Sequence, residues 1–186
     1  VLILLYFMPQ TRKCEEEENP IYTEFKTDRY SPFNRVHDVS KIFGCNTRSV
    51  RYRWEVFIQA LESIKSREAC RILNALDFGA GSLRDTYELA RLGFQVAAID
   101  KNETTLLSLQ QSYDWNAVPN RPNIRGISLF DLERHKKFDV IIAFDVLEHP
   151  YELDEHVSEL RKRLNEGGIM LVTVPNSRSL HEKDAR

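Results

Sequence analysis

The chain has 186 residues, of which 42% are hydrophobic and 29% are charged, and its formal net charge is −2. This length is enough for one domain with a hydrophobic core and too short for two domains of ordinary size. The slightly negative charge excludes a protein whose overall field attracts nucleic acid, so we expect no nucleic-acid partner.

The cysteines and the apolar first residues of the chain give an expectation for the cellular compartment of the protein. Its three cysteines, Cys14, Cys45 and Cys70, form no C-x-x-C pair. A disulfide framework and a structural zinc site are therefore not expected, and we expect a cytoplasmic protein without a metal. The opening "VLILLYFMP" is too short for a membrane span and lacks the basic start and cleavage site of a secretory signal.

The predicted elements begin after a stretch without regular pattern. Residues 1–45 contain an acidic run and scattered prolines, which predict an irregular N-terminal segment. Apolar residues then recur at helical spacing from Val50 to Ile64 and predict a helix over residues 46–66. This helix opens the single domain that we expect over residues 46–186, with its sheet core over 70–176.

Strands and helices alternate along the sheet core. The predicted strands are residues 71–78, 94–100, 124–131, 138–145 and 169–176, and the predicted helices are 83–92, 103–115 and 151–164. The strands read as continuous apolar runs between helices, which is typical of a parallel sheet covered on both faces. The sequence therefore predicts an α/β fold.

The stretch "ALDFGAGSLRDTYELARLGFQVAAID" carries the strongest functional signal. A strand that turns sharply into a helix exposes backbone N–H groups at the carboxyl edge of the sheet, and Gly79 and Gly81 permit a ligand to approach the backbone there. Asp100 ends the next strand of the same right-handed unit, where a carboxylate can accept both hydroxyls of a ribose. The pattern predicts a nucleoside pocket.

The charge beside this loop indicates which nucleoside is bound. A dinucleotide fold places a third glycine at G-x-G-x-x-G, and here that position is Arg84. Asp77 precedes the loop, and its negative charge disfavours a pyrophosphate and favours a cationic ligand group. An NAD-dependent oxidoreductase is therefore only a weaker alternative.

Five motifs in order, "LDFGAGS", "AAIDKN", "LFDLE", "FDVIIAFDVLEH" and "LNEGGIMLVTVPN", resemble the class I methyltransferases that use S-adenosyl-L-methionine. The chain is most similar to the small-molecule group that includes the quinone-biosynthesis methyltransferases. The resemblance implies a Rossmann-like, doubly wound sheet. It also implies an enzyme that transfers a methyl group to a small-molecule acceptor by direct displacement and releases S-adenosyl-L-homocysteine.

The resemblance assigns the first part of a cofactor site. It implies that Asp100 binds the ribose hydroxyls and that Lys101 flanks the adenine. The residues implied to form the first loop, against the methionine part, are Asp77, Gly79, Ala80 and Gly81.

The second part of the implied site follows the third and fourth predicted strands of the sheet core. Asp131 is implied to accept a hydrogen bond from the adenine amine, and Leu132 to offer its backbone N–H. Phe144, Asp145 and Val146 are implied to line the cofactor beside the reacting methyl group.

The chain departs from the family pattern in two places. Leu83 stands where a third glycine usually belongs, and two antiparallel strands that usually follow the fifth strand are not recognisable. The apolar run "MLVTV" would then be an exposed edge unless a dimer or another partner covers it. These departures support an alternative function as an inactive methyltransferase-like binding or regulatory module.

Three polar residues also have simpler interpretations. Asp100 can instead cap the helix that begins near Asn102, and Asp131 can be an ordinary loop aspartate. His149 follows the fourth strand of the core, where it can act as the general base on an acceptor hydroxyl or only fix the local turn by a hydrogen bond. It is the one candidate for a catalytic residue.

The helix over residues 46–66 carries three arginines, Arg48, Arg51 and Arg53. Their spacing favours a solvated helix face over a nucleic-acid surface. Tyr52 and Trp54 on the same helix either belong to the core or form part of a lid over the cofactor.

Overall fold

The structure, a computed structural model, describes residues 2–7, 48–67 and 71–175. Its strands are β1 (Leu2–Phe7), β2 (Asn74–Phe78), β3 (Gln95–Ile99), β4 (Asn123–Arg125), β5 (Phe138–Phe144) and β6 (Leu164–Val174). Its helices are α1 (Arg48–Arg67), α2 (Arg84–Arg91), α3 (Glu103–Gln110), the short 3-10 helix η3 (Leu129–Asp131) and α4 (Leu153–Lys162). The predictions for the three cysteines, and for the side chains of Arg48 and Arg51, lie outside the described part.

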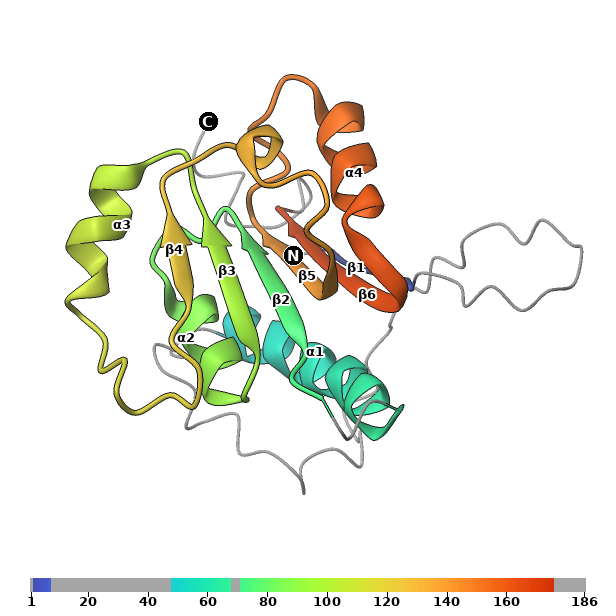
Figure 1. The fold of residues 1–186 in the computed structure, drawn as a ribbon. Helices are drawn as coiled ribbons and strands as arrows, with labels where there is room; N and C mark the ends of the chain where they lie inside the picture. Colours follow the sequence, from blue (N-terminus) through green and yellow to red (C-terminus); the bar gives the residue numbers. More distant parts are fainter. Residues whose placement is uncertain (1, 8–47, 68–70, 176–186) are drawn as a thin grey trace, which may run out of the picture.

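The strands form one sheet in the order β1-β6-β5-β2-β3-β4 (Figure 1). Strands β2 to β6 are mutually parallel. The parallel part of the sheet begins in the middle at β2, adds β3 and β4 on one side, and then returns to add β5 and β6 on the other. This reversal makes the carboxyl ends of β2 and β5 a topological switch point, and open α/β sheets bind ligands in a crevice at such a point.

Strand β1 differs from the predicted irregular segment. It pairs antiparallel with β6 along its length, from Leu2 opposite Val174 to Phe7 opposite Ile169. The prediction of irregular structure is therefore wrong for Leu2–Phe7, because six apolar residues form a strand when an open sheet edge offers hydrogen-bond partners. The same pairing corrects the prediction that the edge formed by "MLVTV" is exposed.

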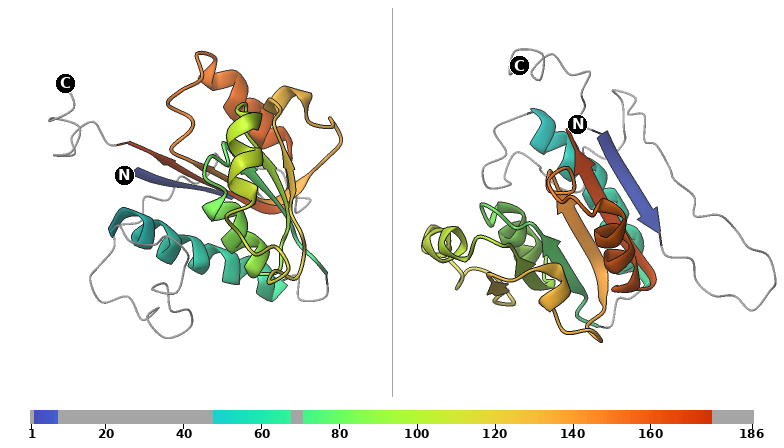
Figure 2. Two further views of the ribbon diagram at one scale, coloured as in Figure 1. Left: turned by 90° about the vertical axis from the view of Figure 1, so that its left-hand side faces the viewer. Right: turned by 90° about the horizontal axis from the view of Figure 1, so that it is seen from above.

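Helices lie on both faces of the sheet (Figure 2). A layer of apolar side chains lies between the sheet and the helices on each face. On one face, Trp54 and Phe57 of α1 and Leu89 of α2 pack with alternate residues of the strands. On the other face, Leu160 of α4 and Leu129 of η3 pack with the remaining strand residues. Every residue of β5 is buried, as expected for a central strand covered on both sides.

Three element boundaries differ from the sequence prediction by more than three residues. Strand β6 begins at Leu164 and not at residue 169, so it includes the stretch that was predicted to end the preceding helix. The strand predicted over 124–131 ends at Arg125, because Ser128 and Asp131 form a turn in which the Ser128 hydroxyl donates to the Asp131 carboxylate at 2.8 Å. The helix predicted over 103–115 ends at Gln110, and its last predicted residue, Trp115, instead donates from its indole N–H to the Gln110 carbonyl at 2.7 Å.

A buried carboxylate ties the amino-terminal ends of the strands together. Both oxygens of Asp139 accept hydrogen bonds from Arg71, at 2.8 and 2.9 Å. The backbone N–H of Asn74 and the side-chain amide of Asn165 donate to the same carboxylate at 2.8 and 2.7 Å. This cluster lies at the edge of the sheet opposite the crevice.

Among the described helices, none is both long enough and apolar enough to cross a bilayer.

Candidate functional site

The loop after β2 needs glycine at its first turn. Gly79 has φ of +75°, and its N–H donates to the Ile99 carbonyl at 2.9 Å. A Cβ atom on Gly79 would lie only 2.4 Å from the Cγ2 atom of Val146. Glycine is therefore required both for the backbone conformation and for the contact between the loops that follow β2 and β5.

Asp100 connects the same loop to the end of β3. One of its carboxylate oxygens accepts the N–H of Gly81 at 3.0 Å, and the other accepts the N–H of Asn102 at 2.9 Å. The N-cap of α3 is Asn102, whose side chain accepts the Thr105 N–H. Asp100 is therefore not the N-cap residue of α3, but it holds the backbone of the N-cap residue in place. Each of its carboxylate oxygens keeps a lone pair for another donor.

Asp77 is a buried acid beneath the loop. Its side chain accepts a hydrogen bond from the Thr86 hydroxyl at 2.5 Å, and only 3% of the residue is exposed. Burial, together with the nearby negative charge of Asp85, raises the pKa of Asp77 to about 7. This carboxyl group therefore changes its charge near neutral pH.

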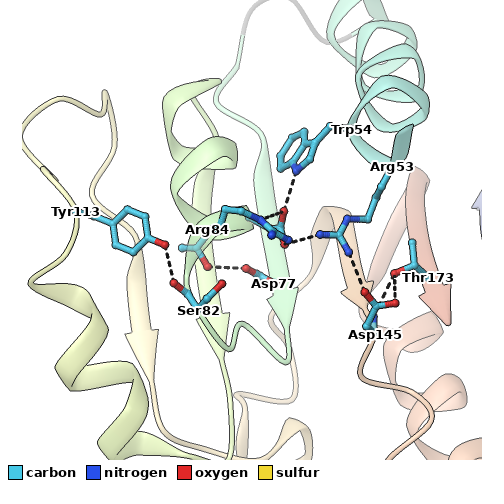
Figure 3. A network of polar contacts seen from close by, with 10 residues as sticks. Arg53, Trp54, Asp77, Ser82, Arg84, Tyr113, Asp145 and Thr173 are labelled. Atoms are coloured by element: carbon cyan, nitrogen blue, oxygen red, sulfur yellow. Dashed lines mark hydrogen bonds and ion pairs between the residues drawn. The ribbon is translucent and has the colours of Figure 1, made fainter. Parts of the chain in front are cut away.

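Arg53 joins α1 to the first turn of α2 and to the loop after β5 (Figure 3). Its guanidinium donates to Asp85 at 3.2 Å and to Asp145 at 3.1 Å, and lies 4.3 Å from the ring centroid of Phe144. Only 4% of the residue is exposed, so the prediction that Arg53 belongs to a solvated face is wrong. Trp54 is fully buried and donates its indole N–H to Asp85 at 2.8 Å, which makes it a core residue.

Asp145 is held in an unusual backbone conformation directly after β5. Its φ of 51° lies in the left-handed region, which non-glycine residues adopt rarely. The Thr173 hydroxyl donates to its carboxylate at 3.0 Å, and its own N–H donates to the Thr173 carbonyl at 2.9 Å. Strain of this kind is concentrated at functional sites.

Asp131 and Leu132 lie at the end of η3 and directly after it. Asp131 is exposed and accepts the Ser128 hydroxyl. Leu132 is buried, and its N–H makes only a long contact of 3.4 Å to the Leu129 carbonyl. Arg163, itself buried, donates to the Leu132 carbonyl at 2.9 Å and so fixes this turn.

His149 lies in the segment that follows β5. Its N–H donates to the Val146 carbonyl at 3.1 Å, and its imidazole Nε2 lies 3.9 Å from a carboxylate oxygen of Glu148. The side chain is 67% exposed, so it is open to a ligand and is not fixed by burial.

Nowhere in residues 2–7, 48–67 and 71–175 do three His, Cys, Asp or Glu side chains gather closely enough to hold a metal ion.

Comparison with known proteins identifies the family. A family model described as a methyltransferase domain matches residues 43–186. The chain belongs to this methyltransferase family. The resemblance found in the motifs is therefore confirmed, and the match favours a methyltransferase over the NAD-dependent alternative.

Among curated proteins, this methyltransferase is similar to enzymes named ubiquinone biosynthesis O-methyltransferase. The one from Pelagibacter ubique is 26% identical over 171 residues, which are 91% of this chain and 67% of the relative. The one from Rickettsia akari is 27% identical over 134 residues, which are 72% of this chain and 52% of the relative. The chain thus spans between about half and two thirds of the length of these relatives.

Among solved structures, the methyltransferase is similar to a S-adenosylmethionine-dependent methyltransferase from Clostridium acetobutylicum. The TM-score is 0.56 with 16% sequence identity, covering 71% of this chain and 53% of the other. At this identity the likeness concerns the fold alone. It confirms the predicted Rossmann-like sheet of the class I methyltransferases.

The structure brings together one group of the predicted site residues. The first loop and the end of β3 share direct hydrogen bonds, and the loop after β5 contacts them through Val146. Lys101 is exposed at the end of β3, and Ala80 is buried within the loop. The Asp131 carboxylate instead accepts its hydrogen bond within its own turn, from Ser128.

Two polar residues of the methyltransferase site were missed by the sequence analysis. Thr86 is fully buried against Asp77, and nothing in its local pattern distinguishes it from an ordinary helix threonine. For Arg53 a signal was present, since it lies one helical turn from both Val50 and Phe57, on the apolar side of α1.

Proposed function

We propose that this chain binds S-adenosyl-L-methionine at the carboxyl ends of β2, β3 and β5 and transfers its methyl group to a small-molecule acceptor. The observation that carries the proposal is the pair of acids on adjacent strand ends, Asp77 and Asp100, around a glycine loop. A buried acid fits a ligand with positive charge, and a partly exposed carboxylate with free lone pairs fits a ribose diol. Family membership supports the same ligand.

The residues of the first loop have distinct proposed roles. Gly79, Ala80 and Gly81 admit the methionine part close to the backbone, and Asp77 supplies a compensating charge. Asp100 accepts both ribose hydroxyls with the lone pairs that Gly81 and Asn102 leave open. Lys101 flanks the adenine.

The remaining proposed contacts lie on η3 and after β5. Asp131 accepts from the adenine amine and Leu132 offers its N–H, which is only weakly engaged in the protein. Phe144, Asp145 and Val146 face the reacting group. Arg53 holds the Asp145 carboxylate, and Phe144 beneath it, in a fixed position.

The acceptor is proposed to be a small hydroxyl compound, because the similar curated enzymes are named O-methyltransferases. S-adenosyl-L-methionine supplies an electrophilic methyl group and leaves as a neutral thioether. The protein then has to align the acceptor oxygen, exclude water and remove the hydroxyl proton. His149 is proposed as the base that takes this proton, with Glu148 beside it. The reaction is proposed to take place in the cytoplasm.

Titration calorimetry tests the proposal directly. The full chain is titrated with S-adenosyl-L-methionine, S-adenosyl-L-homocysteine and NAD. Binding of the first two and not of NAD supports the assignment. A folded protein that binds neither sulfur compound overturns it.

A matched pair of variants then locates the ligand. Asp100→Ala is expected to weaken binding, whereas Asp154→Ala removes an exposed carboxylate from the first turn of α4 and is expected to leave it unchanged. Equal binding by both variants would place the nucleoside elsewhere.

A further inference from the structure

Leu83 occupies a backbone conformation that leucine rarely adopts. Its φ is 60° and its ψ is 8°, in the left-handed region, immediately before the first residue of α2. A Cβ atom makes this conformation unfavourable, which is why glycine is common there. The position is also the one at which the resemblance implies a third glycine. The chain therefore keeps the backbone shape of a glycine while carrying a large side chain.

The Leu83 side chain packs beneath the glycine loop and so anchors the loop to the core. It is fully buried in a cluster with Ala80, Ala98 and Leu106. Because none of it is exposed, it reaches into the core between the loop, β3 and α3 and does not line an open pocket. Its burial offsets the unfavourable backbone conformation.

Tyr113 holds the loop from a second direction (Figure 3). Its hydroxyl donates to the backbone carbonyl of Ser82 at 2.7 Å. Its ring centroid lies 5.0 Å from that of Tyr87 on α2 and 5.3 Å from that of Trp115. Tyr113 and Trp115 also pack against the cluster that contains Leu83. Burial raises the pKa of Tyr113, so its hydroxyl stays protonated and available as a donor.

From these contacts we infer that Leu83 and Tyr113 are positioning residues that hold the glycine loop in the shape that receives the nucleoside ligand. The inference rests on the proposed function. Ser82 and Leu83 directly follow Gly81, whose N–H donates to Asp100. The Leu83 N–H donates to the Ala80 carbonyl at 2.8 Å, and this carbonyl belongs to the same peptide group as the Gly81 N–H. Holding Ser82 and Leu83 in place therefore orients the peptide group that contacts the proposed ribose acid.

The variant Tyr113→Phe tests the hydroxyl alone, since it retains the ring and its aromatic contacts. Loss of one neutral hydrogen bond is expected to weaken S-adenosyl-L-homocysteine binding about fivefold. The KM for S-adenosyl-L-methionine should rise by a similar factor, while kcat at saturation stays unchanged. Tyr151→Phe is the control, because Tyr151 is 100% exposed. Equal affinity in Tyr113→Phe and Tyr151→Phe overturns the role of Tyr113.

A second matched pair tests the anchor. Leu83→Ala and Leu106→Ala both open a cavity in the same buried cluster, so both should lower the melting temperature. Only Leu83 belongs to the loop, so only Leu83→Ala should weaken S-adenosyl-L-homocysteine binding, by about tenfold or more. Equal weakening in the two variants would mean that the cluster acts through stability alone and would overturn the role of Leu83.

Hydrogen exchange separates this inference from the proposed function. If the unmodified chain binds no S-adenosyl-L-homocysteine, the proposed function fails. The positioning role is then tested by the exchange of the Gly81 and Leu83 amides without ligand. Faster exchange in Tyr113→Phe than in Tyr151→Phe supports the inference that Tyr113 restrains the glycine loop, and equal exchange in the two variants overturns it.

Discussion

The Asp100 carboxylate accepts the backbone N–H of Gly81 at 3.0 Å, so the end of β3 and the glycine loop after β2 are joined by a charge-assisted hydrogen bond. The two residues are 19 positions apart in the chain and come from adjacent parallel strands. Asp100 therefore has a structural role in addition to its proposed contact with ribose.

Asp100→Ala should lower both cofactor affinity and stability. Two hydrogen bonds from ribose hydroxyls to a carboxylate are each worth about 1.5–3 kcal/mol, so affinity for S-adenosyl-L-methionine should fall at least about tenfold. Removal of the acceptor for Gly81 and Asn102 should also cost about 1 kcal/mol of unfolding free energy. Calorimetry and urea unfolding measure the two effects separately.

Asp100→Asn provides the comparison for this prediction. Its amide oxygen can still accept one bond, so its affinity should lie between those of the unmodified protein and Asp100→Ala. A lowered melting temperature with unchanged affinity in both variants would leave Asp100 with the structural role only.

The sequence predicted the order of the elements from β2 to β6, and it predicted that the glycine loop and Asp100 lie together at the ends of neighbouring strands. Alternating apolar runs and helices are local signals, and "LDFGAGS" with Asp100 marks the carboxyl ends of two neighbouring strands without any knowledge of distant contacts. The strand β1 could not be predicted, because its pairing partner β6 lies at the other end of the chain and gives no local signal.

Local sequence patterns also gave wrong predictions where a residue lies in an environment that its type usually avoids. Arg53 is charged, and only the packed structure shows that Asp85 and Asp145 compensate its burial. Leu83 breaks the glycine pattern of the loop, and whether it fills the pocket or the core depends on the neighbours that α3 brings to it.

Arg53→Met should destabilise the protein, because it leaves Asp85 and Asp145 without their shared cation. Removing one partner of a buried ion pair typically costs 3–5 kcal/mol, and the partial exposure of Asp145 reduces the expected loss of unfolding free energy to about 2–3 kcal/mol. Urea unfolding measures it, with Arg134→Met, an exposed arginine, as the control. Equal stability of the two variants would show that the Arg53 network contributes nothing.

Asp139→Ala should affect stability and leave the candidate site unaltered. The change removes the acceptor for Arg71, for the Asn74 N–H and for the Asn165 amide, at the edge of the sheet away from the crevice. We expect a loss of about 2–3 kcal/mol in unfolding free energy and unchanged affinity of the folded protein for S-adenosyl-L-homocysteine. An affinity loss comparable to that of Asp100→Ala would contradict the placement of the site.

Asp77 should make stability depend on pH in the direction opposite to that of an ordinary ion-paired acid. Its pKa is raised by burial from 3.8 to about 7 in the folded protein, so the folded state holds this proton more tightly than the unfolded state. The resulting stabilisation is fully present below about pH 4 and is lost as the pH rises toward 7, by up to about 1.4 kcal/mol per pH unit. Urea unfolding between pH 5 and 8 should show this decline relative to Asp77→Asn, and parallel curves for the two proteins would contradict it.

The same proton should control the affinity for the charged ligand. A sulfonium and an ammonium group close to Asp77 favour its ionised form, so S-adenosyl-L-methionine should bind several-fold more tightly at pH 8 than at pH 6. S-adenosyl-L-homocysteine retains the ammonium group but lacks the sulfonium charge, so its affinity should change less over this range. In Asp77→Asn both ligands should lose this pH dependence.

Calorimetry of both ligands at pH 6 and pH 8 tests this prediction. Equal pH dependence for both ligands would place Asp77 beside the ammonium group and not the sulfonium, and no dependence for either would remove Asp77 from contact with the ligand.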